Sequence, residues 1–303
     1  MIAFVRRWLD SDVGHSFRTS PTAIVAAVMA LVCVVCAVFA PWIAPHNPFD
    51  LASLELSNAR LPPSWSEGGN PAFWLGTDDQ GRDILSALMY GARISLAVGL
   101  ASVLLSVVIG VSLGLLAGFL GGWVDSLLMR VCDVMLSFPP ILVALLIAGV
   151  GRALFPEAHD SLALGVLILS ITLTGWVQYA RTVRGSTMVE RQKDYVQAAR
   201  AFGVSDGRIM RRHILPNLTH IVVIVAVLDF SGLVLYEAVL SYVGVGVDPA
   251  TNSFGTMING ARNEMSRDPV VWWNLLTAFA FMVTPPIDPP GAARLMLAVV
   301  ITT

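Results

Sequence analysis

Long apolar windows alternate with polar segments along the chain. Five windows contain no Asp, Glu, Lys or Arg, and they cover residues 22–44, 94–124, 134–151, 161–180 and 270–287. A sixth apolar window, at about 218–247, carries Asp229 and Glu237. A stretch of about 18 apolar residues is long enough to cross a membrane as a helix. The pattern therefore predicts an all-α, polytopic membrane protein with six transmembrane helices.

The windows also divide the chain into segments. We expect a polar lead at residues 1–21, a first membrane helix at 22–44, a long outer loop at 45–93 and a main transmembrane domain at 94–283. Pro21 suits the first turn of the first helix. The lead and the apolar run after it are both too long for a cleaved signal peptide, so this run is expected to stay as a membrane span.

Composition agrees with a membrane location. Hydrophobic residues make up 55% of the chain and charged residues 13%, whereas a soluble domain is about 25% charged. The mean hydropathy is +0.71. The net charge of −2 gives no reason to expect a nucleic-acid partner.

Basic residues are concentrated in one segment, and this sets the predicted orientation. Excess Lys and Arg marks cytoplasmic loops. Eight of the 19 Lys and Arg residues lie between positions 181 and 212: Arg181, Arg184, Arg191, Lys193, Arg200, Arg208, Arg211 and Arg212. The N-terminus is also basic, and four crossings from a cytoplasmic N-terminus return the chain to the cytoplasm at 181–217. Charge and crossing number agree, so residues 45–93 are expected outside.

Charged side chains at membrane depth are costly and indicate function. Asp229 and Glu237 are about two helical turns apart and share a face. They are candidates for lining a translocation pathway or for contacting a partner chain. Arg130 and Asp133 are three residues apart, so they can pair on one helix face. We interpret that pair as structural.

Three glycines in the second window have helical spacing. Gly110, Gly114 and Gly118 recur every four residues. Helices in lipid associate through faces of small residues that let their backbones approach closely. These glycines therefore predict a tight helix–helix contact.

No catalytic, cofactor or metal motif is present in the sequence. Lys193 is the only Lys of the chain and does not belong to GxxxxGK[ST], which excludes a phosphate loop for ATP. There is no GxSxG or HExxH, and the His residues have no metal-ligand spacing. Cys33 and Cys36 have the spacing of a redox motif but lie inside an apolar window, so we interpret them as packing residues. We predict that the chain is not an enzyme, holds no cofactor or metal, and depends on another chain for ATP hydrolysis.

The basic segment contains the sequence "DYVQAARAFGVSDGRIMRRHILPN" from Asp194 to Asn217. Helical spacing places four of its residues on one face of a short amphipathic helix: Tyr195, Ala198, Ala199 and Phe202. Gly203 suits the left-handed position that ends such a helix. Ser205 is expected to cap a second short helix, which Leu215–Pro216 is expected to stop. We call residues 194–216 the elbow.

Two interpretations of the elbow differ in what they explain. A loop that meets anionic lipid headgroups accounts for the charge. It does not account for the small residues, the aromatic residue and the Gly at these intervals. Those features fit a surface inserted into a groove of a partner protein.

The elbow resembles the permease subunits of bacterial ABC importers. Their pattern is Glu-Ala-Ala, a Gly four residues later, and Ile-x-Leu-Pro about ten residues further on. Here Gln197 stands in place of the Glu, and no residue separates Ile214 from Leu215. In that family the segment is a coupling helix that docks in a cleft of the ATPase. The resemblance assigns this coupling role to Gln197, Ala198, Ala199, Gly203, Ile214, Leu215 and Pro216.

Three further stretches are similar to the peptide-type branch of that family. They are "LGTDDQGRDILSALMYGARISL" at 75–96, "GGWVDSLLMRVCDVMLSFP" at 121–139 and "FGTMINGARN" at 254–263, in which Phe254 replaces the usual Trp. The resemblance covers roughly residues 20–283. It implies a type I ABC importer permease fold, a bacterial inner-membrane location with a cytoplasmic N-terminus, and translocation of di- or oligopeptides. The partners implied are a second homologous permease, two ABC ATPase subunits, a periplasmic peptide-binding protein and the surrounding lipid.

The last residues depart from the family. From Thr284 the chain reads "TPPIDPPGAARLMLAVVITT", and its Pro residues would break a helix. We interpret residues 284–303 as an atypical tail produced by an altered reading frame, which distorts the sixth span.

Other functions fit parts of the sequence. Permeases similar to the peptide type carry nickel, glutathione or other small solutes. An ion-driven secondary transporter would use Asp229 and Glu237 as carriers, although no internal repeat supports that class. A membrane scaffold or receptor component without transport activity is a third alternative.

Overall fold

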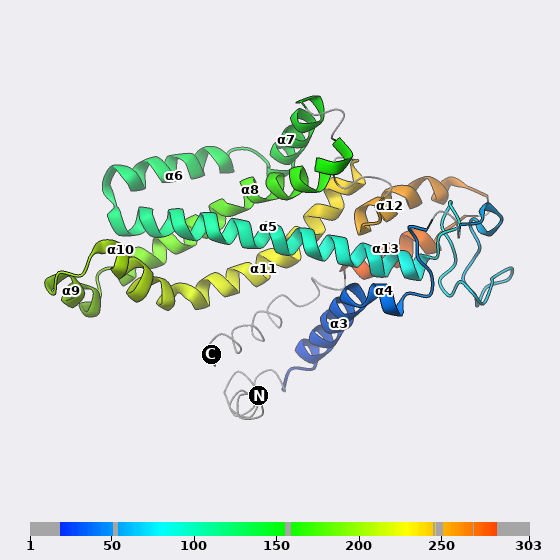
Figure 1. Cartoon of the computed structure of the whole chain (residues 1–303), viewed down its shortest axis with the longest axis horizontal. Helices are drawn as coiled ribbons and strands as arrows, with labels where there is room; N and C mark the ends of the chain where they lie inside the picture. Colours follow the sequence, from blue (N-terminus) through cyan, green and yellow to red (C-terminus); the bar gives the residue numbers. More distant parts are fainter. Residues whose placement is uncertain are drawn as a thin grey trace.

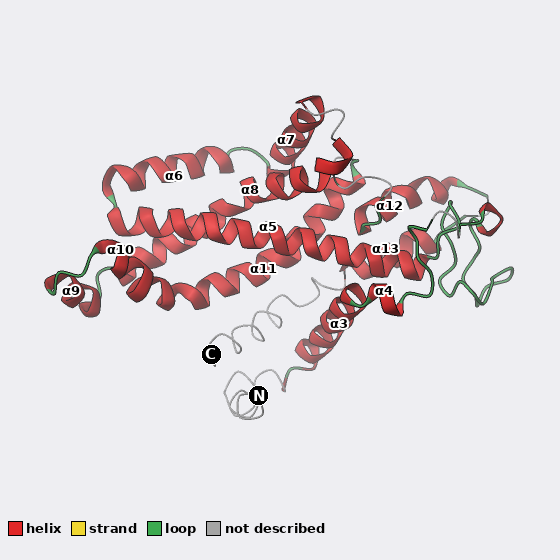
Figure 2. Ribbon diagram, viewed as in Figure 1, coloured by secondary structure: helices red, strands yellow, loops and turns green. Residues whose placement is uncertain are grey.

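The computed structural model describes residues 19–50, 54–154, 159–244, 246, 251–268 and 270–283 (Figure 1). This part of the chain consists of helices and connecting loops and contains no strand (Figure 2). Most of the predicted lead at 1–21 and the whole tail at 284–303 lie outside the described residues.

The described helices follow one another in this order: α3 Pro21–Val38, α4 Ala40–Ile43, η1 Leu56–Asn58, α5 Ile84–Leu120, α6 Gly122–Leu136, α7 Pro140–Leu154, α8 His159–Glu190, α9 Asp194–Ala201, α10 Asp206–Ile209, η2 Met210–Ile214, α11 Leu215–Tyr242, α12 Phe254–Arg262, η3 Asn263–Ser266 and α13 Trp273–Val283. Three are long and apolar enough to cross a membrane: Ile84–Leu120, Ala163–Glu190 and the continuous run Asp206–Tyr242. The bent pair of α6 and α7 makes a fourth candidate span. The all-α polytopic architecture is confirmed, and the number of six spans stays a prediction.

Helix α5 has different ends from its apolar window. It begins at Ile84 rather than at residue 94, because the Asp83 side chain accepts a hydrogen bond from the Ser86 backbone N–H at 3.0 Å and caps the helix. Arg93, which ended the window, lies inside the helix. The helix stops at Leu120, because Gly121 and Gly122 take φ values of +68° and +57°.

The third predicted window, 134–151, is not one straight helix. Helices α6 and α7 meet at an angle of 87° across Ser137–Pro139. Pro140 begins α7, and a residue that precedes a Pro is disfavoured in the helical conformation. An uncharged window carries no sign of such a break, so the window did not predict it.

Other windows also differ from the helices. Helix α8 continues past Ala180 to Glu190, α11 ends at Tyr242 rather than at residue 247, and the first window is divided at Phe39 between α3 and α4. In the last window, the helix begins only at Trp273.

Ion pairs between α6 and α8 explain why α8 continues past its charged residues. Arg184 donates to Asp125, with Nη2 2.6 Å from Oδ2, and Arg181 donates to Asp133. The predicted pairing of Arg130 with Asp133 is wrong, because Asp133 faces α8 and takes Arg181 as its partner.

The most extensive helix contact joins α5 to α8, and the glycine series lies in it. A Cβ atom added at Gly110, Gly114 or Gly118 would stand 2.5, 2.4 or 2.7 Å from a backbone oxygen of Trp176, Ala180 or Arg184, respectively. Real Cβ atoms do not approach that closely. Each glycine therefore lets the backbones of the two long helices meet, as expected for small residues in membrane bundles.

Replacement of Gly114 by Leu is expected to destabilise the purified protein by about 1–3 kcal/mol, because the carbonyl of Ala180 cannot move away like a side chain. Thermal unfolding in mild detergent measures the effect. The matched control is Gly165→Leu on α8, where an added Cβ meets nothing within 4 Å. Equal melting temperatures for the two variants would contradict the packing role of Gly114.

The elbow and the loop that precedes α5 lie at opposite ends of the bundle (Figure 1). We call residues 44–50 and 54–83 the cap loop. Helix α5 extends from the elbow to the cap loop, whereas α8 and the continuous run into α11 extend from the elbow toward α7 and α12, respectively. The fold thus connects a basic end to a loop-covered end along α5, and to α12 along α11.

Candidate functional site

The elbow consists of two short helices joined at a glycine. Helix α9 ends at Ala201, and Gly203 takes φ +74°, the left-handed conformation that the sequence predicts for it. Helix α10 begins after Ser205, whose backbone is in the N-cap conformation. Ser205 occupies the predicted N-cap position, although its side chain makes no cap hydrogen bond.

Helix α9 turns a different face inward from the predicted one. Val196 and Ala199 are buried, whereas Ala198 is exposed and Phe202 is 87% exposed. The four residues expected on a single face are therefore divided between the two sides of the helix. The outer surface carries Gln197 together with Ala198 and Phe202.

The inner face of the elbow is packed against the ends of the long helices. One apolar cluster combines residues of the elbow with residues of α5, α8 and α11: Val196, Ala199, Ile209, Ile214, Leu115, Phe119, Val183 and Leu218. Ile209 and Ile214 are completely buried. Burial of this kind stabilises by roughly 1.5–3 kcal/mol per large aliphatic side chain. The elbow is therefore a rigid part of the bundle.

Polar contacts add to this anchoring. The Arg191 Nη1 donates to the Phe119 carbonyl oxygen at 3.2 Å, and the Arg200 guanidinium lies 4.9 Å from the centre of the Phe119 ring. The Tyr195 hydroxyl donates to Glu190 at 2.6 Å. Burial, and then the bond to Glu190, raise the pKa of this hydroxyl, which keeps it protonated as a donor.

The predicted helix stop at Leu215–Pro216 is wrong. Helix α10 continues through the π-helical turn η2 into α11, and the Leu215 N–H bonds to the Met210 carbonyl five residues earlier. Proline lacks an N–H, and its ring clashes with the carbonyl four residues before it in an α-helix. The wider π turn just before Pro216 relieves that clash. The chain reverses at Gly203 instead, and the residues from Asp206 to Tyr242 form one continuous helical run.

The two acidic residues of α11 have separate partners. The Asp229 Oδ2 accepts from the Tyr179 hydroxyl of α8 at 2.8 Å. Glu237 has no exposed surface in this chain, and it accepts from the Ser95 hydroxyl of α5 and the Ser241 hydroxyl, each at 2.7 Å. Of these two acidic residues, Asp229 is partly accessible to solvent in the single chain, whereas Glu237 is not.

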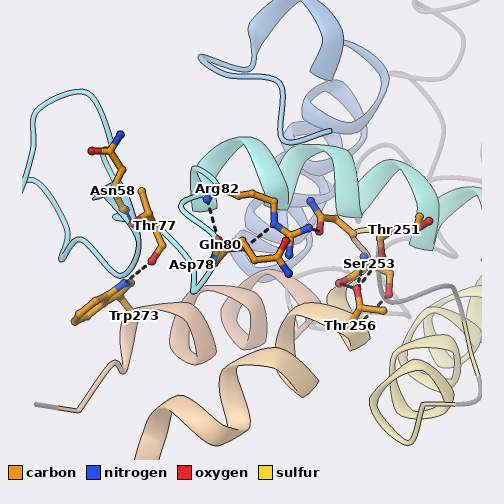
Figure 3. A network of polar contacts seen from close by, with 10 residues as sticks. Asn58, Thr77, Asp78, Gln80, Arg82, Thr251, Ser253, Thr256 and Trp273 are labelled. Atoms are coloured by element: carbon orange, nitrogen blue, oxygen red, sulfur yellow. Dashed lines mark hydrogen bonds and ion pairs between the residues drawn. The ribbon is translucent and has the colours of Figure 1, made fainter. Parts of the chain in front are cut away.

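At the other end of the bundle, polar contacts fix the cap loop on α12 and α13 (Figure 3). Arg82 donates to Asp78 at 2.7 Å and to Asn252, which precedes α12, at 3.1 Å. The Trp273 indole donates to the Thr77 carbonyl oxygen at 3.2 Å. Glu264 accepts from Arg60 at 2.8 Å, and this bond raises the pKa of Arg60.

No arrangement for metal binding occurs among the residues that the structure describes, in which no group of three or more His, Cys, Asp and Glu side chains converges. Cys33 and Cys36 are free thiols on the apolar helix α3.

Two family models match the sequence. The model for "Binding-protein-dependent transport system inner membrane component" matches residues 110–287, which include the elbow. The model for "N-terminal TM domain of oligopeptide transport permease C" matches residues 9–63. The chain belongs to this family of binding-protein-dependent transport permeases.

Curated relatives cover most of the permease. The dipeptide transport system permease protein DppC of Escherichia coli K12 is 41% identical over 276 residues, which span 88% of this chain and 87% of the relative. The di/tripeptide transport system permease protein DppC of Pseudomonas aeruginosa is 38% identical and covers 78% of this chain and 73% of its own length. The glutathione transport system permease protein GsiD of Shigella flexneri is 38% identical, with coverages of 84% and 78%.

A solved structure shares the fold of the permease. It is described as an inward-facing conformation of the MetNI methionine ABC transporter, with 20% identity and a TM-score of 0.57. The match covers 71% of this chain and 96% of that chain. The importer-permease fold predicted from the sequence is confirmed.

Sequence reasoning missed several residues that make the interior contacts of the permease. Val196 has the right spacing to Ala199 for an inward face, but the predicted face started one residue earlier, at Tyr195, and left Val196 out. Ser95 and Tyr179 carried no signal, because their acidic partners on α11 are far away in the sequence.

Proposed function

We propose that this permease is the transmembrane subunit of an ATP-driven importer that carries di- or oligopeptides across the bacterial inner membrane. The observation that carries the proposal is the elbow, in which an exposed Phe202 directly follows helix α9, whose inner face is packed into the bundle. Such a surface fits a groove of an ATPase subunit. The substrate class rests on the names of relatives up to 41% identical.

The elbow supports a coupling role through its outer and inner residues. Gln197, Ala198 and Phe202 make the contact with the ATPase, while Ala199 and Ile214 transmit it into the bundle through their buried packing. Gly203 sets the angle between α9 and α10, and Leu215 and Pro216 lie where the elbow passes into α11. ATP binding closes the ATPase dimer, and the elbow moves with it as a rigid part.

The complete importer contains four kinds of protein chain. They are this permease, a second homologous permease, a pair of ABC ATPases and a periplasmic peptide-binding protein. The basic elbow faces the cytoplasm, as does the N-terminus, and the cap loop faces the periplasm. Exposed apolar side chains on α3, α5 and α7 face lipid or the second permease. Six spans complete the transmembrane domain.

The translocation pathway lies between the two permeases, and Asp229 is its acidic candidate in this chain. Its bond to Tyr179 keeps the carboxylate oriented while part of it stays accessible. Glu237 is enclosed by its own chain, so we assign it a different role below. Glutathione is itself a tripeptide, so the relative GsiD is compatible with the same substrate class.

Purification of the tagged permease from its native membrane in mild detergent, with mass spectrometry of the co-purifying chains, tests the assembly. We expect a homologous permease and an ATPase with a GxxxxGK[ST] loop. Recovery of the permease alone, from membranes in which those chains are present, would contradict the proposal.

A further inference from the structure

Glu237 is a completely buried acid that the pathway described above does not use. It lies in the last two turns of α11, and both of its carboxylate oxygens accept hydrogen bonds. Oε2 accepts from the Ser95 hydroxyl of α5, and Oε1 accepts from the Ser241 hydroxyl on its own helix, each at 2.7 Å. A buried carboxyl group is costly unless its oxygens are satisfied, so these partners hold it in place.

Ser95 connects this carboxylate to the start of helix α12. Its hydroxyl donates to Glu237 and also accepts from the Phe254 N–H, the first residue of α12, at 3.4 Å. The first backbone N–H groups of a helix have no partner inside the helix. The capping box of Ser253 and Thr256 satisfies other N–H groups at this end of α12. Glu237 and Ser95 thereby fix the amino end of α12.

Close backbone packing at the same place sets how α12 lies on α11. A Cβ atom at Gly255 would stand 2.2 Å from the Ala238 carbonyl oxygen and 2.6 Å from the Ser241 Cβ. Helix α12 therefore packs directly on the backbone of α11 at Ala238, the residue after Glu237, with no side chain between the two helices. Packing this close leaves no space for a side chain between the two helices at this point.

Helix α11 extends this connection to the elbow. Asp206–Tyr242 forms one helical run of 37 residues, which corresponds to about 55 Å at 1.5 Å per residue. The elbow lies at its first end, and Glu237 lies five residues before its last. Figure 1 shows α12 near the opposite end of the bundle from α9 and α10.

We propose that Glu237 is a positioning residue that fixes the amino end of α12 to α5 and α11, so that movement of the elbow repositions α12 at the far end of the bundle. The inference rests on the proposed function, because the ATPase supplies the movement. Helix α12 in turn holds the cap loop through Asn252 and Arg82 (Figure 3). The surface of the cap loop thus changes its position in step with ATP binding.

Hydrogen exchange in the complete importer tests this role. The complex is purified with a hydrolysis-deficient ATPase, and amide exchange of the elbow and of α12 is measured with and without ATP. The variants are Glu237→Ala and Ser95→Ala, with Ser112→Ala as the matched control, because Ser112 is an exposed serine of α5 whose hydroxyl donates to the Val108 carbonyl oxygen of the same helix. If Glu237→Ala does not assemble, Glu237→Gln is used, since it keeps the shape and one acceptor oxygen.

We expect ATP to change exchange at both the elbow and α12 in the wild type and in Ser112→Ala. In Glu237→Ala and Ser95→Ala the response of α12 is lost, while the response of the elbow and the co-purification of the ATPase are retained. A purely structural role would raise exchange at α12 but leave its ATP-dependent change intact, which would overturn the inference. Absence of the ATPase from the wild-type complex would instead overturn the proposed function, and the inference with it.

Discussion

Replacement of Gly203 by Pro is expected to abolish coupling between ATP hydrolysis and uptake while the permease remains in the membrane. Gly203 takes φ +74°, whereas the proline ring fixes φ at about −65°. The substitution therefore forces α9 away from the angle at which it leaves the bundle. Because the ATPase has to receive α9 in that orientation, we expect the rate of ATP-dependent uptake to fall at least about tenfold, which corresponds to about 1.4 kcal/mol.

Two control variants separate the backbone effect from other effects at this position. An added Cβ at Gly203 meets nothing within 4 Å, so a side chain there causes no clash. Asn adopts the left-handed conformation more readily than most residues, and Gly203→Asn is expected to retain most of the uptake. Gly207→Ala changes another exposed glycine of the elbow, which also has no neighbour within 4 Å and has an ordinary φ. Normal uptake by Gly203→Pro would refute the role of this turn.

Replacement of Phe202 by Ala is expected to weaken binding of the ATPase without affecting the permease itself. The side chain is 87% exposed, so its removal costs the isolated chain almost no packing. An aromatic side chain that becomes buried in a partner groove contributes about 2 kcal/mol or more as a binding hot spot. That loss corresponds to roughly 30-fold weaker binding.

Titration of detergent-solubilised permease with the purified ATPase measures the effect of Phe202→Ala. Leu56→Ala is the matched control, because Leu56 is 80% exposed and lies in the cap loop at the opposite end of the bundle. Wild-type and control should bind alike. Equal affinity in Phe202→Ala would show that the exposed aromatic residue does not contact the ATPase.

Apolar windows located the long helices α5, α8 and α11 but not their ends. Arg93 closed a window although the helix around it continues, because the helix is capped earlier, at Asp83. Arg181 and Arg184 closed another window, although both are paired with acidic residues of α6. A charged residue ends an apolar window in the sequence even when it is paired with a residue of another helix in the fold. That partner is not visible in a local pattern.

The elbow was predictable in outline for a local reason. Gly203 and the short helix before it follow from backbone preferences of single residues. The inward face of α9 did not follow, because Val196 and Ala198 are both small and apolar and only the position of α5 decides between them. The continuation through Pro216 depends on a π turn, for which the sequence gives no specific pattern.

The interior contacts of Glu237 lay beyond sequence reasoning. Spacing correctly placed two acids on α11, but it could not show that one of them reaches Ser95, 142 residues away. A single sequence contains no record of such a long-range pair. The enclosure of Glu237 in its own chain favours a positioning role over a place in the pathway.

Uptake of a radiolabelled dipeptide into proteoliposomes that contain the complete importer tests the central claim most directly. The vesicles are compared with ATP supplied on the side of the ATPase, with ATP absent, and with an imposed proton or Na⁺ gradient in place of ATP. The account predicts accumulation that requires ATP and the binding protein and is lost in Gly203→Pro. Accumulation driven by the ion gradient in vesicles that contain this chain alone would contradict it.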